Sequence, residues 1–507
     1  MFTCRSISEQ TKCMPLSLNT IHFSTVYRRD WTPRAGCFNF ITLFYPLLAG
    51  DMVRRLEPFI TPDMYSQLAL KFPTFVRRLQ HLSEGGQEDL EMIEHGKPHV
   101  TLRIPSGGAA SSFLSDFHGF LHRGTNIRHA DAYCRLSTSF RSVRGTQGTT
   151  FYVLRLLAEK QPVEFAKLVY ETLPHWVDTH PAHEFLDLGF NLWDIPSRPE
   201  LAHVASRLGV DEVWNMVDPW CYRPLWSYKS WTSSSEDILL KDAEPPHKGA
   251  RCRQKIRFSA VAVAIRFLGQ LPVDQRRQIR NVTLHEDFEA VGDQPSHAQG
   301  LAPLFKENPQ LWVERRVSVI RCISEGIRLQ SDTAEDVAWF VDEPSHPKLT
   351  SYVEDRKSMR SISFSEALSD WLLDALAVPD AGIPAESFRF VLEGGPDVDF
   401  CTDLFQQVVQ RDIAWHKAYQ ASIQRGLLVY WPRLQKGLVS EGFAEAMDHL
   451  RNQTSFLRSD FHTGHPWNWE DLVEKKPGTL QMKWVGDYPF RQPWYTEFPP
   501  ALATRLS

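Results

Sequence analysis

The sequence predicts an α+β fold that is predominantly α-helical with a few short strands. Three observations lead to this prediction. Apolar residues recur at intervals of three or four over most of the chain, which is the spacing of an amphipathic helix. Serine and glycine residues mark the ends of several of these segments. Only short segments alternate apolar and polar residues as strands do.

Several segments carry clear helix signals. They are Pro62–Leu79, Phe151–Leu173, Ser197–Gly209, Ser363–Val378 and Thr402–Arg425. In the third of these, Ser197 and Glu200 have the spacing of a capping box, and Gly209 follows the last apolar residue. The last segment predicts the longest helix of the chain.

Three short segments predict strands. Val100–Ile104 alternates between two prolines, Phe388–Leu392 alternates before a glycine pair, and a third strand is expected near Val282–Leu284. Ser259–Leu268 is a continuous apolar run, so it predicts burial but not the type of element.

The chain divides by pattern at its start. Residues 1–51 show no clean period and predict a poorly ordered N-terminal extension. Residues 52–507 show no long break and predict a single large, mainly helical unit. The polar, proline-containing segment 230–248 is then an exposed loop within that unit.

Composition bounds the class of protein. A formal net charge of −5, with both signs mixed along 507 residues, gives no general electrostatic attraction to nucleic acid or anionic membranes. The eight cysteines include no C-x-x-C pair and indicate reduced thiols. The apolar stretch Cys37–Leu48 is shorter than a bilayer span, and no secretory signal is visible. We therefore expect a cytoplasmic or nuclear protein without a membrane partner.

One basic stretch departs from this mixture of charges. Lys241–Arg257 carries six cations against Asp242 and Glu244. The favoured interpretation is a solvated segment. The alternative is a phosphate-contacting patch or a nuclear import signal, so binding of nucleic acid is the less favoured prediction.

The common catalytic motifs are missing from the sequence. It has no P-loop, no G-x-G-x-x-G, no G-x-S-x-G elbow, no H-E-x-x-H and no kinase set. We therefore predict no cofactor, no metal and no catalytic residue.

Local histidine clusters keep an enzyme open as the alternative function. These clusters are His118 and His122 beside Asp116, His180 and His183 beside Glu184, His285 beside Glu286 and Asp287, and His462 and His465 beside Asp460. Each could supply metal ligands or a general base. The simpler interpretation of each cluster is a set of exposed polar side chains. An enzyme of unfamiliar class would need three of them in one pocket.

The segment Leu271–Leu284 reads LPVDQRRQIRNVTL and is similar to the L-P-x-E-L-R-x-x-I-W-x-x-x-L signature of fungal F-box-like domains. Gln275 and Arg280 depart from that pattern. The resemblance implies a small helical module that docks an adaptor of a ubiquitin ligase. The partner-binding residues that it implies are Leu271, Pro272, Arg276 and Ile279.

A broader resemblance covers most of residues 150–470. The runs FSAVAVAIRFLGQLP, IRNVTLHEDFEAV and HAQGLAPLFKENPQLWVERRV look like a group of filamentous-fungal proteins with no assigned activity. Together the two resemblances and the missing motifs favour a non-enzymatic interaction protein, with an F-box-like adaptor as its specific form.

Overall fold

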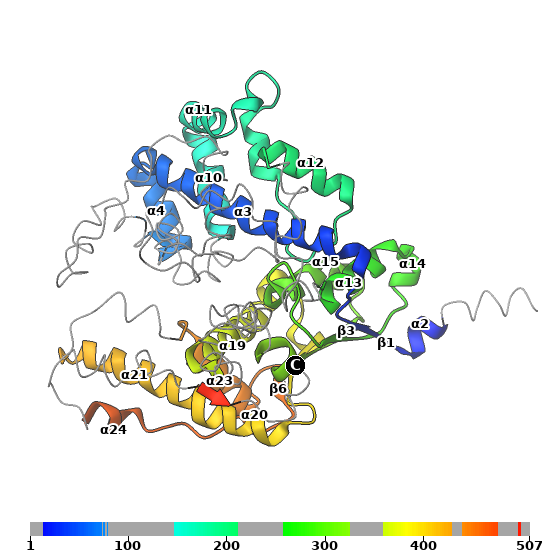
Figure 1. Cartoon of the computed structure of the whole chain (residues 1–507), viewed down its shortest axis with the longest axis vertical. Helices are drawn as coiled ribbons and strands as arrows, with labels where there is room; N and C mark the ends of the chain where they lie inside the picture. The colour runs from blue at the N-terminus through cyan, green and yellow to red at the C-terminus, as the bar shows by residue number, and fades with distance from the viewer. Residues whose placement is uncertain are drawn as a thin grey trace, which may run out of the picture. The chain divides into compact units, whose positions relative to one another are not determined.

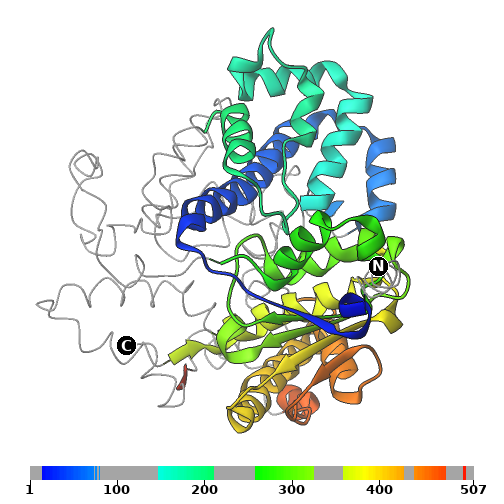
Figure 2. The ribbon, with the colours of Figure 1, turned by 90° about the vertical axis from the view of Figure 1, so that its right-hand side faces the viewer.

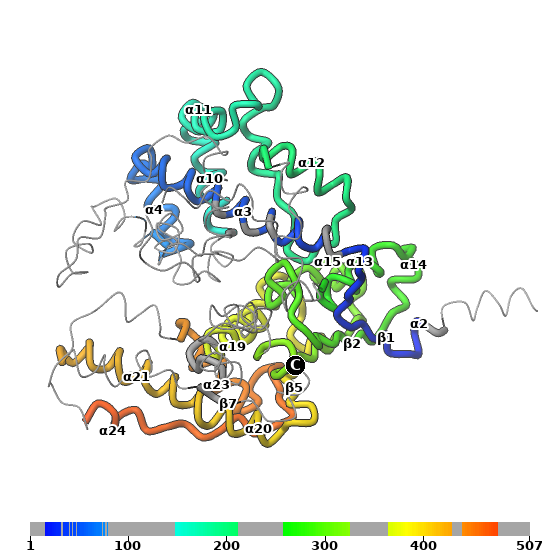
Figure 3. Tube along the Cα trace, viewed as in Figure 1, coloured from blue at the N-terminus to red at the C-terminus, as the bar shows by residue number. Residues whose placement is uncertain are grey.

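A computed structural model describes residues 14–73, 147–210, 257–324, 358–427, 439–474 and 495–497, together with residues 75, 76 and 79. Figure 3 colours the path of the chain through these residues. The strand predicted at Val100–Ile104, the loop at 230–248 and the basic stretch before Arg257 lie outside them. His118 and His122 lie outside them as well.

The chain forms two compact units, whereas the sequence pattern indicated one from residue 52 onward. The first unit takes residues 1–32, 191–195 and 248–507, and the second takes residues 33–190 and 196–247. Each unit is therefore built from segments that are not contiguous in the sequence.

The second unit is helical throughout its described part (Figure 1). Its helices are α3 (Thr32–Leu56, whose first residue belongs to the first unit), α4 (Pro62–Lys71), α10 (Gln147–Lys160), α11 (Pro162–Thr172) and α12 (Arg198–Leu208). Short 3₁₀ turns follow at η2 (Glu57–Phe59), η3 (Pro174–Trp176) and η4 (Ala182–Asp187). The predicted helical segment Phe151–Leu173 is divided into α10 and α11, and α11 begins at Pro162 because proline suits the first turn of a helix.

Among the described residues, one helix is long and apolar enough to cross a membrane by length and composition. It covers Arg34–Phe59, and 93% of its most apolar window is buried inside the structure. The sequence stretch Cys37–Leu48 alone is shorter than a bilayer span, but the helix continues beyond both of its ends. Burial of this kind is also found in the core helices of folded domains.

The first unit is organised around a five-stranded sheet. Its order is β1 (Thr20–Ser24), β2 (Asn281–Glu286), β3 (Trp312–Ser318), β5 (Phe388–Glu393) and β6 (Leu457–Ser459), and every pair is parallel. Figure 2 shows β1, drawn in blue, along one edge of this sheet. A short antiparallel pair joins β4 (Ser358–Arg360) to β7 (Tyr495–Glu497).

The elements between these strands are mostly helical. They are α2 (Met14–Leu18), η1 (Arg29–Trp31), α13 (Ala260–Gln270), α14 (Val273–Arg276), η7 (Gln294–Leu301), α15 (Ala302–Glu307), the π-helical turn η8 (Val319–Ser324), α19 (Ser361–Leu376), η9 (Pro379–Ala381), η10 (Ala385–Ser387), α20 (Val398–Leu404), the π-helical turn η11 (Phe405–Val409), α21 (Gln410–Gln424), α23 (Phe443–Asn452) and α24 (Trp469–Glu474). The described residues are mostly helical with a small sheet, which confirms the coarse α+β prediction.

Residues 14–56 contain regular elements, although the sequence predicted a poorly ordered extension over residues 1–51. Strand β1 pairs with β2 over five residues, more than 250 positions later in the chain. That pairing gives the segment a structure that its own polar sequence does not signal.

The two faces of the sheet differ in character. One face contributes Val282, Leu284, Val313, Val317, Phe388, Phe390 and Leu392 to a single hydrophobic core with residues of α13, α19, α20 and α23. The opposite face carries a charged group in which Arg316 pairs with both Glu314 and Glu393. Strands that follow their chain order in a parallel sheet place right-handed connections on one face, which accounts for this difference.

Most predicted elements that fall on described residues are present. Ser259–Leu268 is a helix, α13, and the strands near Val282–Leu284 and at Phe388–Leu392 are β2 and β5. The long helix predicted at Thr402–Arg425 is the continuous run α20, η11 and α21. The strands β1, β3 and β6 were not predicted.

The capping box of α12 provides a test of local stability. The Ser197 hydroxyl accepts a hydrogen bond from the Glu200 amide, and the Glu200 carboxylate accepts one from the Ser197 amide. We expect Ser197→Ala to lower the free energy of unfolding by about 1 kcal/mol. The matched control is Ser206→Ala at an exposed position of the same helix, which should change it by less than about 0.5 kcal/mol. Urea denaturation of both variants measures the difference, and equal midpoints would contradict the role of the cap.

Candidate functional site

The residues that the F-box-like resemblance singles out form a corner between helices α13 and α14. The Ser259 hydroxyl accepts a hydrogen bond from the Ala262 amide and starts α13. Pro272 precedes α14, which is only four residues long. The chain then enters β2 at Asn281. The segment is thus the end of the connection that leads into the sheet at β2.

The four candidate residues have different environments in this corner. Ile279 keeps only 1% of its surface and belongs to the core, so it is not available for docking. Leu271 is half-buried and packs against the same core. Pro272 is exposed. The structure therefore brings the four residues together but leaves only part of the set on the surface.

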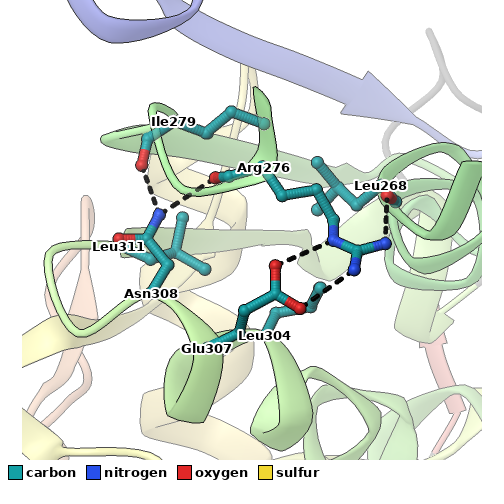
Figure 4. A pocket seen from close by; sticks show the side chains of 7 residues that line it. All are labelled: Leu268, Arg276, Ile279, Leu304, Glu307, Asn308 and Leu311. Carbon is teal, nitrogen blue, oxygen red and sulfur yellow. Dashed lines mark hydrogen bonds and ion pairs between the residues drawn. The ribbon is translucent and has the colours of Figure 1, made fainter. Parts of the chain in front are cut away.

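Arg276 holds the corner in shape (Figure 4). Its guanidinium donates to both carboxylate oxygens of Glu307 at 2.9 Å, and also to the carbonyl oxygens of Leu268 and Leu271. This pairing lowers the pKa of Glu307 and raises that of Arg276. A two-bonded guanidinium–carboxylate pair fixes orientation as well as charge. Arg276 is therefore a structural residue of the corner.

A small hollow lies beside this ion pair. The Asn308 amide closes it by donating to the carbonyl oxygens of Ile279 and Arg276 at 2.7 and 3.1 Å. The apolar wall consists of Leu268, Leu304 and Leu311. The hollow has room for about one water molecule, since its interior volume is close to 10 Å³. It is too small for an organic ligand.

Two large apolar side chains are exposed at the same corner. Phe267, on the last turn of α13, keeps 40% of its surface, and Val273, at the start of α14, keeps 44%. With the exposed Pro272 they make up what we call the corner patch. Arg266, Asp274 and Arg277 are exposed around it. Sequence analysis did not identify Phe267 because it falls within an apolar run whose outward face could not be assigned.

A buried polar network lies beneath α13. Glu286 and Arg315 are fully buried and form an ion pair at 3.2 Å. The Glu286 carboxylate also accepts the first amide of α13, from Ala260, and the side-chain amide of Gln294. Arg315 donates to the carbonyl oxygens of Gln294 and Pro295 and stacks on Trp371. Every charge in this network therefore has a partner.

Ser259 and His297 form a second buried contact beside this network, with 2.6 Å between the hydroxyl and Nδ1. The pair has the residue types of a nucleophile and its base. However, the hydroxyl already caps α13, and His297 Nε2 lies 2.8 Å from the Gly292 carbonyl oxygen. Both side chains are buried. The contact is therefore a satisfied structural hydrogen bond.

The predicted histidine clusters are divided between the two units. His180 and His183 belong to the second unit, whereas His285 belongs to the first. His462 and His465 lie close together after β6, with ring centroids 4.8 Å apart and ring planes tilted by 54°. Within the described part of the chain, no group of three or more His, Cys, Asp or Glu side chains could hold a metal ion.

Comparison with known proteins adds no relative. No family model, no curated protein and no solved structure matches the chain.

The Glu286–Arg315 pair yields a prediction about stability. Arg315→Met should cost about 3–5 kcal/mol of unfolding free energy, because it leaves the Glu286 carboxylate buried without its partner. The double variant Glu286→Gln with Arg315→Met should recover most of that loss, since both charges are then absent. Guanidinium denaturation measures both values. A cost below about 1 kcal/mol for the single variant would contradict the assigned pairing.

Asp374 yields a prediction about pH. It lies on α19, half-buried, 3.4 Å from the side-chain amide of Gln299. Desolvation, with smaller contributions from the charges of Asp293 and Asp370, raises its pKa to about 8 against the opposing effect of Arg315. The folded chain therefore binds a proton more tightly than the unfolded chain, whose Asp pKa is about 3.9. Stability from this group is complete below about pH 4 and is lost as the pH rises toward 8.

We expect Asp374→Asn to flatten this pH dependence. One proton bound only by the folded chain would change the unfolding free energy by at most about 1.4 kcal/mol per pH unit. The substitution should remove a fraction of this slope, because Asp374 keeps some contact with solvent. The control is Asp380→Asn, at an exposed position of η9. Urea midpoints between pH 5 and 8 give the slopes. Equal slopes of urea midpoint against pH for the wild type and the Asp374 variant would show that this carboxyl does not contribute to the pH dependence of stability.

Proposed function

We propose that the chain is a non-enzymatic interaction protein that binds a partner protein through the corner patch. The supporting observation is the exposure of Phe267, Pro272 and Val273 at the corner of α13 and α14, where Arg276 is held by its ion pair with Glu307. Exposed apolar groups with a polar rim are typical of protein-binding surfaces. The proposal includes a cytoplasmic or nuclear location, as expected from the sequence.

The charged residues around the corner patch indicate which kind of partner surface would fit it. Arg266 and Arg277 outnumber Asp274 around the patch. A complementary partner would present an apolar groove with an acidic border. The resemblance of Leu271–Leu284 to fungal F-box-like domains supports an adaptor subunit of a ubiquitin ligase as that partner. Pro272 would then contact the adaptor, while Arg276 and Ile279 keep the corner in shape.

The test is affinity purification of the full chain from cells of a filamentous fungus, followed by mass spectrometry. Four chains are compared: the wild type, Phe267→Asp, Val273→Asp and Val163→Asp. The last is the matched control, since Val163 is 74% exposed on α11 of the second unit. We expect the wild type and the control to recover a cullin–adaptor complex.

Both corner variants should recover at least tenfold less of this complex, because each introduces a charge into the contact. All three substitutions lie on the surface, so the four purified chains should have the same circular dichroism spectrum. Wild-type samples without the adaptor, or corner variants that retain it as the control does, would contradict the proposal.

A further inference from the structure

Two histidine side chains meet at the edge of the five-stranded sheet. His22 is the central residue of the edge strand β1, and His285 lies near the end of β2. Nδ1 of His22 and Nε2 of His285 are 3.1 Å apart, and the two rings are stacked with 5.4 Å between centroids. His22 is exposed and His285 is half-buried, so solvent reaches the pair. Neither the proposed function nor the predicted histidine clusters account for this contact.

We propose that His22 and His285 form a two-ligand site for a divalent transition metal of the zinc and copper class. Imidazole nitrogens bind these ions at about 2.0–2.1 Å. With bonds of about 2.05 Å, a nitrogen separation of 3.1 Å subtends an angle of about 98° at the ion. This angle lies between the roughly 90° of square-planar ligands and the roughly 109° of tetrahedral ligands. The separation thus already suits a chelate.

The strands fix this separation. In the parallel register, His22 lies opposite Thr283, and Ser24 lies opposite His285, so the two histidines are diagonal neighbours on one face. Residues at such positions lie within reach of one another when their side chains are long or aromatic. The register of β1 on β2 therefore places both imidazoles where one ion can reach a nitrogen of each ring.

The protonation change balances within the pair. In the contact, one of the two facing nitrogens carries a proton and donates a hydrogen bond, and the other nitrogen accepts that bond. That proton moves to the second nitrogen of the same ring when the metal binds. Each neutral imidazole then offers one lone pair, and no net proton is released. Water fills the remaining coordination positions, since the described residues supply no third His, Cys, Asp or Glu there.

Metal binding would tie the N-terminal strand to the rest of the unit. The two ligands are 263 positions apart in the sequence, so an ion that bridges them closes a very long loop. An ion that binds only the folded chain also stabilises it by mass action. Cu²⁺ should bind more tightly than Zn²⁺ or Ni²⁺, in the general order for nitrogen sites.

The test titrates the full-length chain with CuCl₂ and with ZnCl₂ by calorimetry. The variants are His22→Asn and His285→Asn, which keep a polar side chain of similar size. The matched control is His203→Asn, at an exposed position of α12. We expect His22→Asn and His285→Asn each to lose one Cu²⁺ site or to bind that Cu²⁺ ion at least tenfold more weakly. The His203→Asn control should bind Cu²⁺ as the wild type does.

Two further readouts separate this site from other metal-binding side chains. Electron paramagnetic resonance of the Cu²⁺ form should show two coupled nitrogens in the wild type and fewer in either variant. Zinc should raise the melting temperature of the wild type and the control more than that of the variants. If both variants bind Cu²⁺ and respond to zinc as the control does, the proposal is wrong.

Discussion

The first unit depends on how one buried ion pair is accommodated. Glu286 and Arg315 occupy adjacent strands, β2 and β3, on the face that packs against the helices. Taking both charges out of water costs several kcal/mol per ion, and their attraction offsets this only when the remaining polar atoms are also bonded. The start of α13 and the turn η7 supply those bonds. The positions of these elements are therefore tied to the pair.

The sheet joins segments far apart in the sequence to the strands that carry this ion pair. Its strands follow chain order and run parallel, so the connections that pack on them share one core. The opposite face is left with charged side chains such as Arg316 and Glu393. The same arrangement places the end of α13 beside the edge strand, where Phe267 contacts Phe23. The corner patch and the histidine pair are both found at this edge of the unit.

Sequence signals were sufficient to predict a helix or strand where the residues of that segment alone determine its structure. The cap at Ser197, the proline at Pro162 and the alternation of Phe388–Leu392 each define an element without reference to the rest of the chain. Strand β3 was missed because Arg315 occupies a core position and interrupts the apolar alternation. Strand β1 was missed because its structure comes from pairing with a distant partner.

The candidate site was only partly accessible to sequence reasoning. The pattern LPVDQRRQI identified the corner, but it could not distinguish the buried Ile279 from the exposed Pro272. Phe267 sits in an apolar run, so its exposure depends on which side of α13 meets the sheet. The contact between His22 and His285 needs the register of β1 on β2. Each of these facts is set by tertiary packing and not by spacing.

The most direct test of this account is native-state hydrogen exchange of the full chain in increasing low concentrations of denaturant. If the buried pair anchors the sheet, the amides of β2, β3 and β5 should exchange only through one cooperative opening of the first unit, with a common and steep denaturant dependence. Exchange of the β3 amides around Arg315 by local fluctuation, independent of denaturant and faster than that of β5, would contradict it.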